Sequence, residues 1–211
     1  TQLGGHGIYL SPDKMQISPC EHARDTANVL SRYGEAIAIR HCAFGEGNAY
    51  LSEVAEHASV PVLSMQCDVY HPCQILADLL TIREKLGGWN DKKIVFIGDG
   101  DNNMSRSWMW AAKYLEFELV VAAPESCLPS EDYMTHLNAP NVTLTTDPVE
   151  AAKDAHVINT DVWLSMGQEG QTEKEELFGS YQVNAELLTH CADNHIVLHC
   201  LPAYREKEIT E

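Results

Sequence analysis

The fold is best predicted from the stretch DVYHPCQILAD, residues 68–78, because it starts a helix whose first turn carries several polar side chains. Proline fits the first helical position, where its missing N–H would have had no partner. Apolar residues then recur at helical spacing until two glycines at 87 and 88 end the helix. His71 and Gln74 are three residues apart, so both can point past the helix start, where unpaired N–H groups favour an anionic or strongly polarised ligand. The alternative is a helix cap that binds nothing.

The composition is that of a globular protein. With 211 residues, 45% hydrophobic and 21% charged, the chain is long enough for one large domain or two small ones. The formal net charge of −17 argues against nucleic acid or an anionic membrane as partner. No apolar run reaches the ~20 residues that cross a bilayer, and the first residues do not read as a signal peptide. Seven scattered cysteines, an odd number, favour reduced thiols and a cytoplasmic location.

Helical and strand-like patterns alternate along the chain, which predicts an α/β fold. The residues 87–91, Gly-Gly-Trp-Asn-Asp, are the expected hinge between two open parallel-sheet α/β domains, residues 1–88 and 89–211, with the active site in the cleft between them. Before the hinge we expect helices at 21–33 and 48–58 and strands at 8–10, 35–40 and 60–65. After it we expect strands at 93–98, 118–123, 142–144, 156–160 and 196–202.

Polar residues follow several of these strands. In open parallel sheets, ligands bind beyond the carboxyl ends of the strands. Arg40, Asn102, Asp161 and Cys200 all occupy such ends. A single cleft between the two domains is therefore expected to collect them.

Two weaker patterns were weighed against this site. Residues 98–100, Gly-Asp-Gly, follow a strand as in dinucleotide-binding loops, but the third glycine position holds Asn103, so the signal is partial. Cys67, His71 and Cys73 are residue types that bind zinc, yet no second cluster completes four ligands. We therefore expect no metal site and no cofactor.

Cys200 beside His199 has the residue types of a nucleophile and its base. Adjacent residues of a strand point to opposite faces, so we expect the two side chains not to meet. This expectation argues against a protease-like pair.

Three ordered segments carry a resemblance to a known family. HPCQ at 71–74, DVWLSMG at 161–167 and HCLP at 199–202 resemble motifs of the transcarbamylases, and the middle one is similar to that of the ornithine carbamoyltransferases in particular. LGGH at 3–6 and DTANVLSR at 25–32 extend the resemblance over essentially the whole chain. The family is cofactor-free and usually forms homotrimers or larger homo-oligomers, so the resemblance implies the same here. It also implies a cis peptide bond before Pro202.

The resemblance implies a reaction and a role for each site residue. The carbamoyl group of carbamoyl phosphate would pass to the δ-amine of L-ornithine, giving citrulline and phosphate in arginine metabolism. Residues implied to bind carbamoyl phosphate are Gln16, Arg40, His71, Gln74, Cys200 and Leu201. Those implied to bind ornithine are Asn102, Asp161, Ser165 and Met166. Catalysis would fall to Arg40 and His71, which donate to the carbonyl oxygen, and to Cys200, which orients or deprotonates the amine.

Two departures from the family pattern leave alternatives open. The Ser-Thr-Arg-Thr phosphate loop would lie just before Thr1, and a C-terminal segment with another arginine is absent, so a fragment of a longer chain is expected. A relative that uses another amine, such as putrescine or aspartate, would differ at Ser-Met-Gly, residues 165–167. A transcarbamylase-like chain that only binds a ligand or a partner subunit is the reading from a different class. A nucleotide-binding Rossmann protein is the third.

Overall fold

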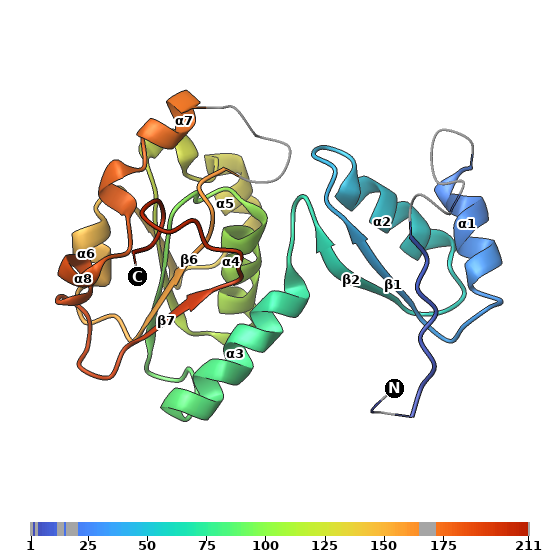
Figure 1. The fold of residues 1–211 in the computed structure, drawn as a ribbon, viewed down its shortest axis with the longest axis horizontal. Coiled ribbons are helices and arrows are strands. Elements are labelled where there is room, and N and C mark those ends of the chain that lie inside the picture. The colour runs from blue at the N-terminus through green and yellow to red at the C-terminus, as the bar shows by residue number, and fades with distance from the viewer. Residues whose placement is uncertain (1, 3, 12–14, 16–20, 165–171, 211) are drawn as a thin grey trace.

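The computed structural model describes residues 2, 4–11, 15, 21–164 and 172–210, and within them it forms two parallel sheets (Figure 1). The strands are β1 (Ile37–His41), β2 (Val62–Cys67), β3 (Lys93–Ile97), β4 (Glu118–Ala122), β5 (Val142–Thr145), β6 (Val157–Thr160) and β7 (Ile196–His199). The helices are α1 (Ala23–Leu30), α2 (Gly47–His57), α3 (Pro72–Leu86), α4 (Asn103–Leu115), α5 (Glu131–Leu137), α6 (Pro148–Ala152), α7 (Thr172–Glu176) and α8 (Ala185–Leu188), with 3-10 turns at Glu125–Cys127 and Gly179–Tyr181.

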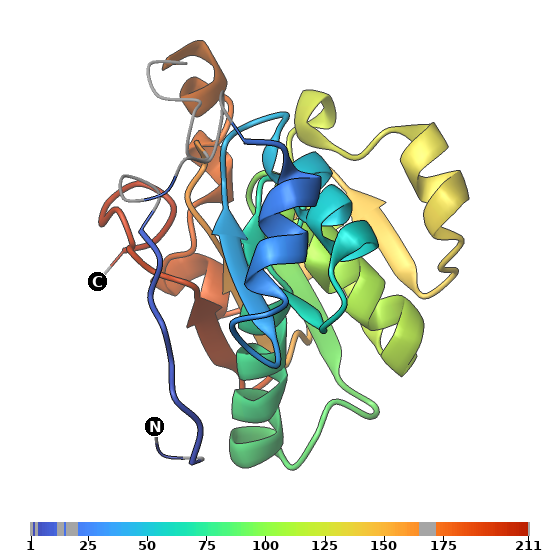
Figure 2. The ribbon, with the colours of Figure 1, turned by 90° about the vertical axis from the view of Figure 1, so that its right-hand side faces the viewer.

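The first sheet contains β1 and β2, paired in parallel. Helices α1 and α2 cover one of its faces, as the view in Figure 2 shows, and bury Ala23, Ala27 and Val54 against it. The other face carries Leu63 and Met65, which are about half exposed. The apolar residues of this sheet therefore find cover on one side only.

The second sheet has the strand order β5-β4-β3-β6-β7, all parallel. Its central strand, β3, is apolar and buried from Ile94 to Ile97, as expected for a strand with both faces covered. Ile94 and Phe96 pack against α3, α4 and α5 on one face, and Val95 and Ile97 pack against α6 and α8 on the other. The parallel α/β fold predicted from the sequence is confirmed.

Helix α3 connects the two sheets and begins, as predicted, with proline in its first turn. Gly87 ends it in the left-handed conformation, with φ of 81°, which glycine adopts without strain. The buried residues Ile75, Leu79 and Ile82 pack with the core of the second sheet, although they precede the expected hinge. The division into residues 1–88 and 89–211 stays a prediction.

Two strand predictions need correction. Residues 8–10 form no strand and are exposed, since the structure pairs no other described segment with them. The last strand ends at His199 rather than at residue 202, because the chain turns at Leu201, which has a φ of 58° and a cis peptide bond to Pro202. That cis bond agrees with the prediction. Within the described part of the chain, no helix has both the length and the apolar character to cross a membrane.

Candidate active site

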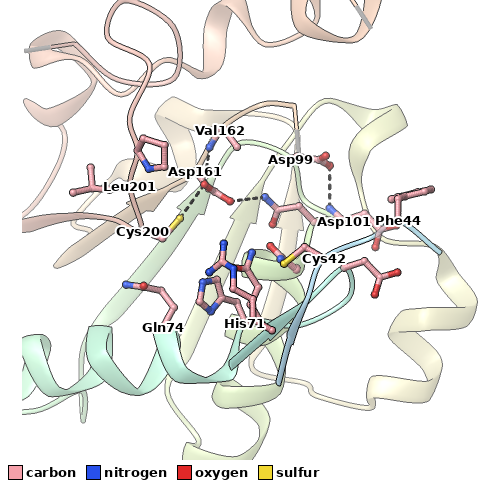
Figure 3. A pocket seen from close by; sticks show the side chains of 16 residues that line it. Cys42, Phe44, His71, Gln74, Asp99, Asp101, Asp161, Val162, Cys200 and Leu201 are labelled. Carbon is pink, nitrogen blue, oxygen red and sulfur yellow. Dashed lines mark hydrogen bonds between the residues drawn. The ribbon is translucent and has the colours of Figure 1, made fainter. Parts of the chain in front are cut away.

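A cleft of about 290 Å³ lies between the end of the first sheet and the carboxyl edge of the second (Figure 3). Every predicted site residue that the structure describes lines this cleft: Arg40, His71, Gln74, Asn102, Asp161, Cys200 and Leu201. Gln16, Ser165 and Met166 lie outside the described residues. The geometry thus brings the predicted residues together, while their individual roles stay predictions.

One wall of the cleft comes from β1 and the start of α3. Arg40 stands at the C-terminal end of β1, and His71 precedes the first turn of α3. The backbone N–H of His71 donates to Ser107 Oγ of α4 at 2.7 Å. Burial, with a smaller contribution from Arg40, lowers the pKa of His71, so its imidazole is neutral at pH 7. Its Nδ1 atom is buried and has no partner among the described residues.

The opposite wall is centred on Asp161, which follows β6 and is 7% exposed. Its Oδ1 accepts hydrogen bonds from Cys200 Sγ at 3.0 Å and from the Val162 N–H at 2.8 Å. Its Oδ2 accepts from Asn102 Nδ2 at 3.2 Å. Burial nevertheless raises the pKa of Asp161, because these donors offset only part of the lost hydration.

Cys200 is held as a thiol. Burial and the neighbouring Asp161 carboxylate raise the pKa of Cys200 far above its ordinary value. A protonated thiol cannot take up a further proton. The arrangement therefore favours an orienting role for Cys200 over the deprotonating role that the sequence also allowed.

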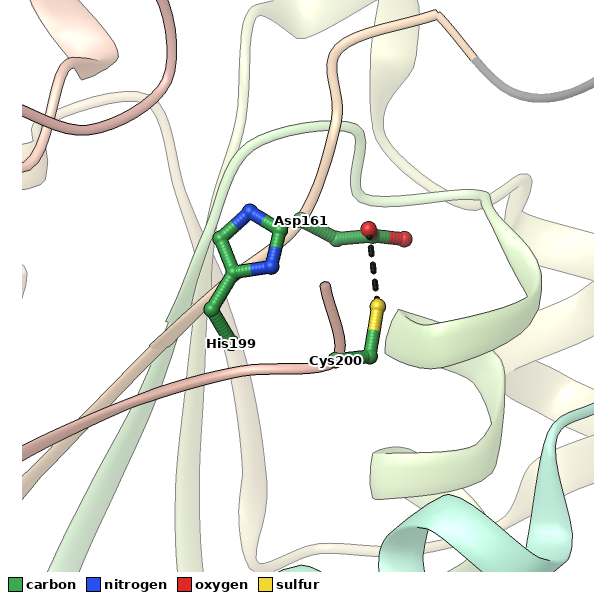
Figure 4. A group of neighbouring side chains, drawn as sticks. All are labelled: Asp161, His199 and Cys200. Atoms are coloured by element: carbon green, nitrogen blue, oxygen red, sulfur yellow. Dashed lines mark hydrogen bonds between the residues drawn. The ribbon is translucent and has the colours of Figure 1, made fainter. Parts of the chain in front are cut away.

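The expectation that His199 and Cys200 stay apart is wrong. Polar atoms of Asp161, His199 and Cys200 lie within 4.8 Å of one another (Figure 4), because β7 ends at His199 and the strand alternation does not reach Cys200. His199 is nevertheless fully engaged: Nδ1 accepts from the Leu201 N–H at 2.8 Å, and Nε2 lies 3.1 Å from Glu208 Oε1. A metal ion or a nucleophile–base pair at this trio would have to break these bonds.

Asp68 is a site residue that sequence reasoning missed. Its carboxylate accepts from the Gly45 N–H at 2.8 Å and from the Asn48 N–H at 2.7 Å, which fixes the start of α2 beside the cleft. At Gly47 an added Cβ would lie 2.0 Å from the His41 carbonyl oxygen, so this close approach requires glycine. No local pattern pairs Asp68 with residues 20 and 23 positions earlier.

The charges along the cleft are mostly negative. The carboxylates are those of Asp68, Asp99, Asp101 and Asp161, against the single guanidinium of Arg40. Asp99 forms an ion pair with Lys174, and Asp101 binds Arg106 through two hydrogen bonds of 2.8 and 3.0 Å. The lining therefore combines the positive charge of Arg40 with the carboxylates of Asp68 and Asp161, which have no Lys or Arg partner among the described residues.

Comparison with known proteins agrees with this geometry. Residues 1–84 match the profile of the carbamoyl-P binding domain of aspartate/ornithine carbamoyltransferase, and residues 90–211 match the profile of its Asp/Orn binding domain. The chain belongs to the aspartate/ornithine carbamoyltransferase family. Within this family's two domains, Arg40 and His71 fall in the first matched segment, and Asp161 and Cys200 fall in the second.

Relatives in the family are similar over the whole chain. The chain is 55% identical to the ornithine carbamoyltransferase of Akkermansia muciniphila over all its residues, which span 69% of that relative. It is 43% identical to the catabolic ornithine carbamoyltransferase of Thermoplasma acidophilum, of which it spans 70%. Among solved structures, that of ornithine carbamoyltransferase from Pyrococcus furiosus is 41% identical, with a TM-score of 0.88 over 99% of this chain and 67% of that one.

Proposed function

We propose that this carbamoyltransferase moves the carbamoyl group of carbamoyl phosphate to the δ-amine of L-ornithine, giving citrulline and phosphate. The observation that carries the proposal is that one wall of the cleft offers hydrogen-bond donors and a positive charge, while the other offers a buried carboxylate. Arg40 and a neutral His71 form one wall, and the buried carboxylate of Asp161 with the Cys200 thiol forms the other. Names of relatives that span the whole chain, such as that of Akkermansia muciniphila, support the same reaction.

The first wall suits the electrophile. As the amine attacks, negative charge develops on the carbamoyl oxygen, and donors already aimed at that position stabilise it. Arg40 supplies a permanent positive charge, and the neutral imidazole of His71 donates one hydrogen bond. The start of α3 adds the partial positive charge of its unpaired N–H groups. On this proposal residues 1–88 form the carbamoyl-phosphate domain.

The second wall suits the amine. Asp161 attracts the α-ammonium group of ornithine, which fixes the neutral δ-amine over the carbamoyl carbon. Approach of that ammonium supplies the counter-charge that the buried Asp161 carboxylate lacks. Attack forms the new C–N bond, breaks the C–O bond to phosphate and releases the extra amine proton. Asn102 holds Asp161 and caps α4 through the Ser105 N–H at 2.8 Å, and on this proposal residues 89–211 form the ornithine domain.

The acidic lining also bears on which amine is used. Asp68 and Asp161, the cleft aspartates without a Lys or Arg ion-pair partner among the described residues, disfavour a dicarboxylate such as aspartate, since it would bring two more negative charges. Putrescine lacks the α-carboxylate of ornithine and remains the alternative amine within the enzyme class. Ser165 and Met166 stay predicted ornithine contacts. Gln16 and Leu201 stay predicted carbamoyl-phosphate contacts.

We also propose that the protein is a cytoplasmic homotrimer or larger homo-oligomer of arginine metabolism, as its resemblance to the family implies. Light scattering coupled to size-exclusion chromatography tests the oligomer. A monomer that forms citrulline at full rate would contradict this part of the proposal and leave the reaction intact.

The test of the reaction offers ornithine, putrescine and aspartate in parallel, each with carbamoyl phosphate, and measures the carbamoylated product and phosphate from the full-length protein. We expect product with ornithine alone. Product with putrescine or aspartate instead would change the amine. Absence of turnover with all three, together with measurable binding of carbamoyl phosphate, would favour a ligand-binding role.

A further inference from the structure

A buried carboxylate lies one helical turn beyond Gln74. Asp78 is 5% exposed and lies on the face of α3 that packs against the second sheet. Its Oδ1 accepts from Gln74 Nε2 at 3.0 Å, and its Oδ2 lies 3.5 Å from Asn159 Nδ2 on β6. Asp78 itself does not line the cleft, whereas Gln74 does. A buried acid without a cation partner among the described residues calls for an explanation beyond stability.

The hydrogen bond to Asp78 determines which way round the Gln74 amide is used. An ionised carboxylate only accepts hydrogen bonds, so it selects the NH₂ group of Gln74. Asp78 takes one of the two N–H groups of Nε2 and so fixes the orientation of the amide, which leaves Oε1 free to accept from a ligand in the cleft. Gln74 is thereby set as an acceptor.

We propose that Asp78 is a positioning residue that fixes the Gln74 amide as an acceptor for the N–H groups of a carbamoyl group, and so makes the site reject a carboxyl group in the same place. The inference rests on the proposed function, because it assigns Gln74 to the carbamoyl end of the substrate. A carboxylate has two acceptor oxygens and no N–H, and would face Gln74 Oε1 with lone pair against lone pair. Discrimination of this kind is strong where a buried polar group would be left unpaired.

The ionisation of Asp78 sets the range of pH in which this works. Burial raises the pKa of Asp78 to about 6, and the hydrogen bond from Gln74 and the nearby His199 lower it by less. Above that pH the carboxylate is charged and holds the Gln74 NH₂ group. Below it, the protonated acid can donate to Oε1, and the amide is free to turn over.

Groups on the packed elements bear on this titration. His199 of β7 and Cys200 just beyond it are the titratable groups that interact with Asp78 in the described residues. The Cys200 thiol is protonated throughout, and the Nδ1 atom of His199 accepts from the Leu201 N–H. From β6, Asn159 contributes an amide that does not ionise. Asp78 is the group whose titration the wild type has and Asp78→Asn lacks.

The test uses two stable probes on the full-length protein. Phosphonoacetamide keeps the amide of carbamoyl phosphate, with a methylene in place of the bridging oxygen, and phosphonoacetate carries a carboxylate there instead. Calorimetry gives both dissociation constants at pH 7.5 without any turnover. We expect the preference for the amide over the carboxylate to fall about tenfold in Asp78→Asn, because an asparagine at this position can hold Gln74 either way round.

Controls separate this role from a structural one. Asp147→Asn, the same change at a helix cap outside the cleft, should leave the preference as it is in the wild type. Between pH 7.5 and 5.5 the wild-type preference should fall more than that of Asp78→Asn, because the probes titrate alike for both proteins. Asp78→Ser, a second uncharged substitution, gives the same comparison should asparagine prevent folding.

The outcomes also separate the two proposals. Failure of the wild type to bind phosphonoacetamide would count against the carbamoyl-phosphate site and hence the proposed function. Tight binding of the amide probe with a preference that Asp78→Asn and Asp78→Ser leave unchanged would overturn the role of Asp78 alone.

Discussion

The two sheets of this protein serve the cleft in different ways. The first has two strands and a small core cluster of Ala23, Ala27 and Val54, and it leaves Leu63 and Met65 half exposed. The second has five strands with apolar cores on both faces. Yet the first sheet supplies the one guanidinium that lines the cleft among the described residues, whereas the second supplies the buried carboxylate of Asp161. The comparison teaches that the positive charge of Arg40 lies on the sheet with the smaller buried core.

This difference predicts unequal stability. A region with few buried apolar contacts opens at lower free energy than a fully enclosed core. Two hydrogen bonds tie the weaker region to the stronger: His71 N–H to Ser107 Oγ, and Asn103 Nδ2 to the Cys67 carbonyl at 2.9 Å. Four experiments test the contrast, from the largest expected effect to the smallest.

Trp108→Ala tests the larger core. Trp108 is fully buried on α4 and packs edge-on against Phe117, so its truncation should lower the free energy of unfolding by about 3–5 kcal/mol. Val54→Ala in the smaller core should lower it by only about 1.5 kcal/mol. Urea unfolding followed by circular dichroism measures both. Equal losses would mean that the smaller core loses more free energy per atom removed and is the better packed of the two, which contradicts the contrast.

Arg40→Met tests whether the guanidinium on the less stable first sheet is needed for the reaction. Loss of a preorganised donor to developing negative charge should lower kcat about 100- to 1000-fold, or about 2.7–4 kcal/mol. Citrulline formation measures the effect, and unfolding in urea should change little. Arg32→Met, at an exposed position outside the cleft, is the matched control. Turnover that stays within threefold of the wild type would remove Arg40 from the reaction.

Asp78→Asn tests the junction between the two regions through pH. The pKa of Asp78 is about 6 in the folded protein, against 3.8 for an aspartate in the unfolded chain. Between pH 3.8 and 6 the folded chain therefore binds more protons than the unfolded chain. Its folding is therefore weakened by about 2–3 kcal/mol as pH rises from 4 to 7. Asparagine does not ionise, so the free energy of unfolding of the variant should rise relative to that of the wild type as the pH increases from 4 to 7. The same difference in free energy of unfolding between wild type and variant at pH 4.5 and pH 7 would contradict this prediction.

Ser107→Ala should give the smallest effect. It leaves the His71 N–H without its acceptor and should weaken carbamoyl phosphate binding about fivefold, near 1 kcal/mol. The KM for carbamoyl phosphate measures it, with kcat less affected. Ser52→Ala, at an exposed position of α2 that does not line the cleft, removes a side-chain bond to the Asn48 carbonyl and is the control. An unchanged KM would mean that the link does not hold the helix start in place.

Much of the fold was predictable because its signals are local. Apolar runs such as residues 94–97 and the proline start of α3 depend on neighbours in sequence, and alternation of strands and helices then implies parallel sheets. Residues at strand ends, such as Arg40 and Asp161, could be assigned to one cleft for the same reason. The roles given to them depend on the family and stay predictions.

What sequence could not give depends on contacts across distant segments. Two examples are the hydrogen bond from the Asn48 N–H to Asp68 and the one from the His71 N–H to Ser107. Each joins residues 20 or more positions apart. The approach of His199 to Cys200 depends on where the last strand stops. The apolar triplet at 8–10 has strand-like residues but no pairing strand among the described residues.

The packing of α3 separates two kinds of boundary. In the alignment to the family profiles, the seam falls between residues 84 and 90, directly after this helix. In three dimensions, Ile75, Leu79 and Ile82 share a core with β3 and α4, so no seam exists there. A protease that nicks the backbone at Gly87 and Gly88 would leave two pieces still clasped by that core. If residues 1–84 are exchanged for those of a relative, the new α3 must therefore pack correctly into the core of the second sheet. Hybrids divided near residue 70 keep α3 with that core and should fold more readily.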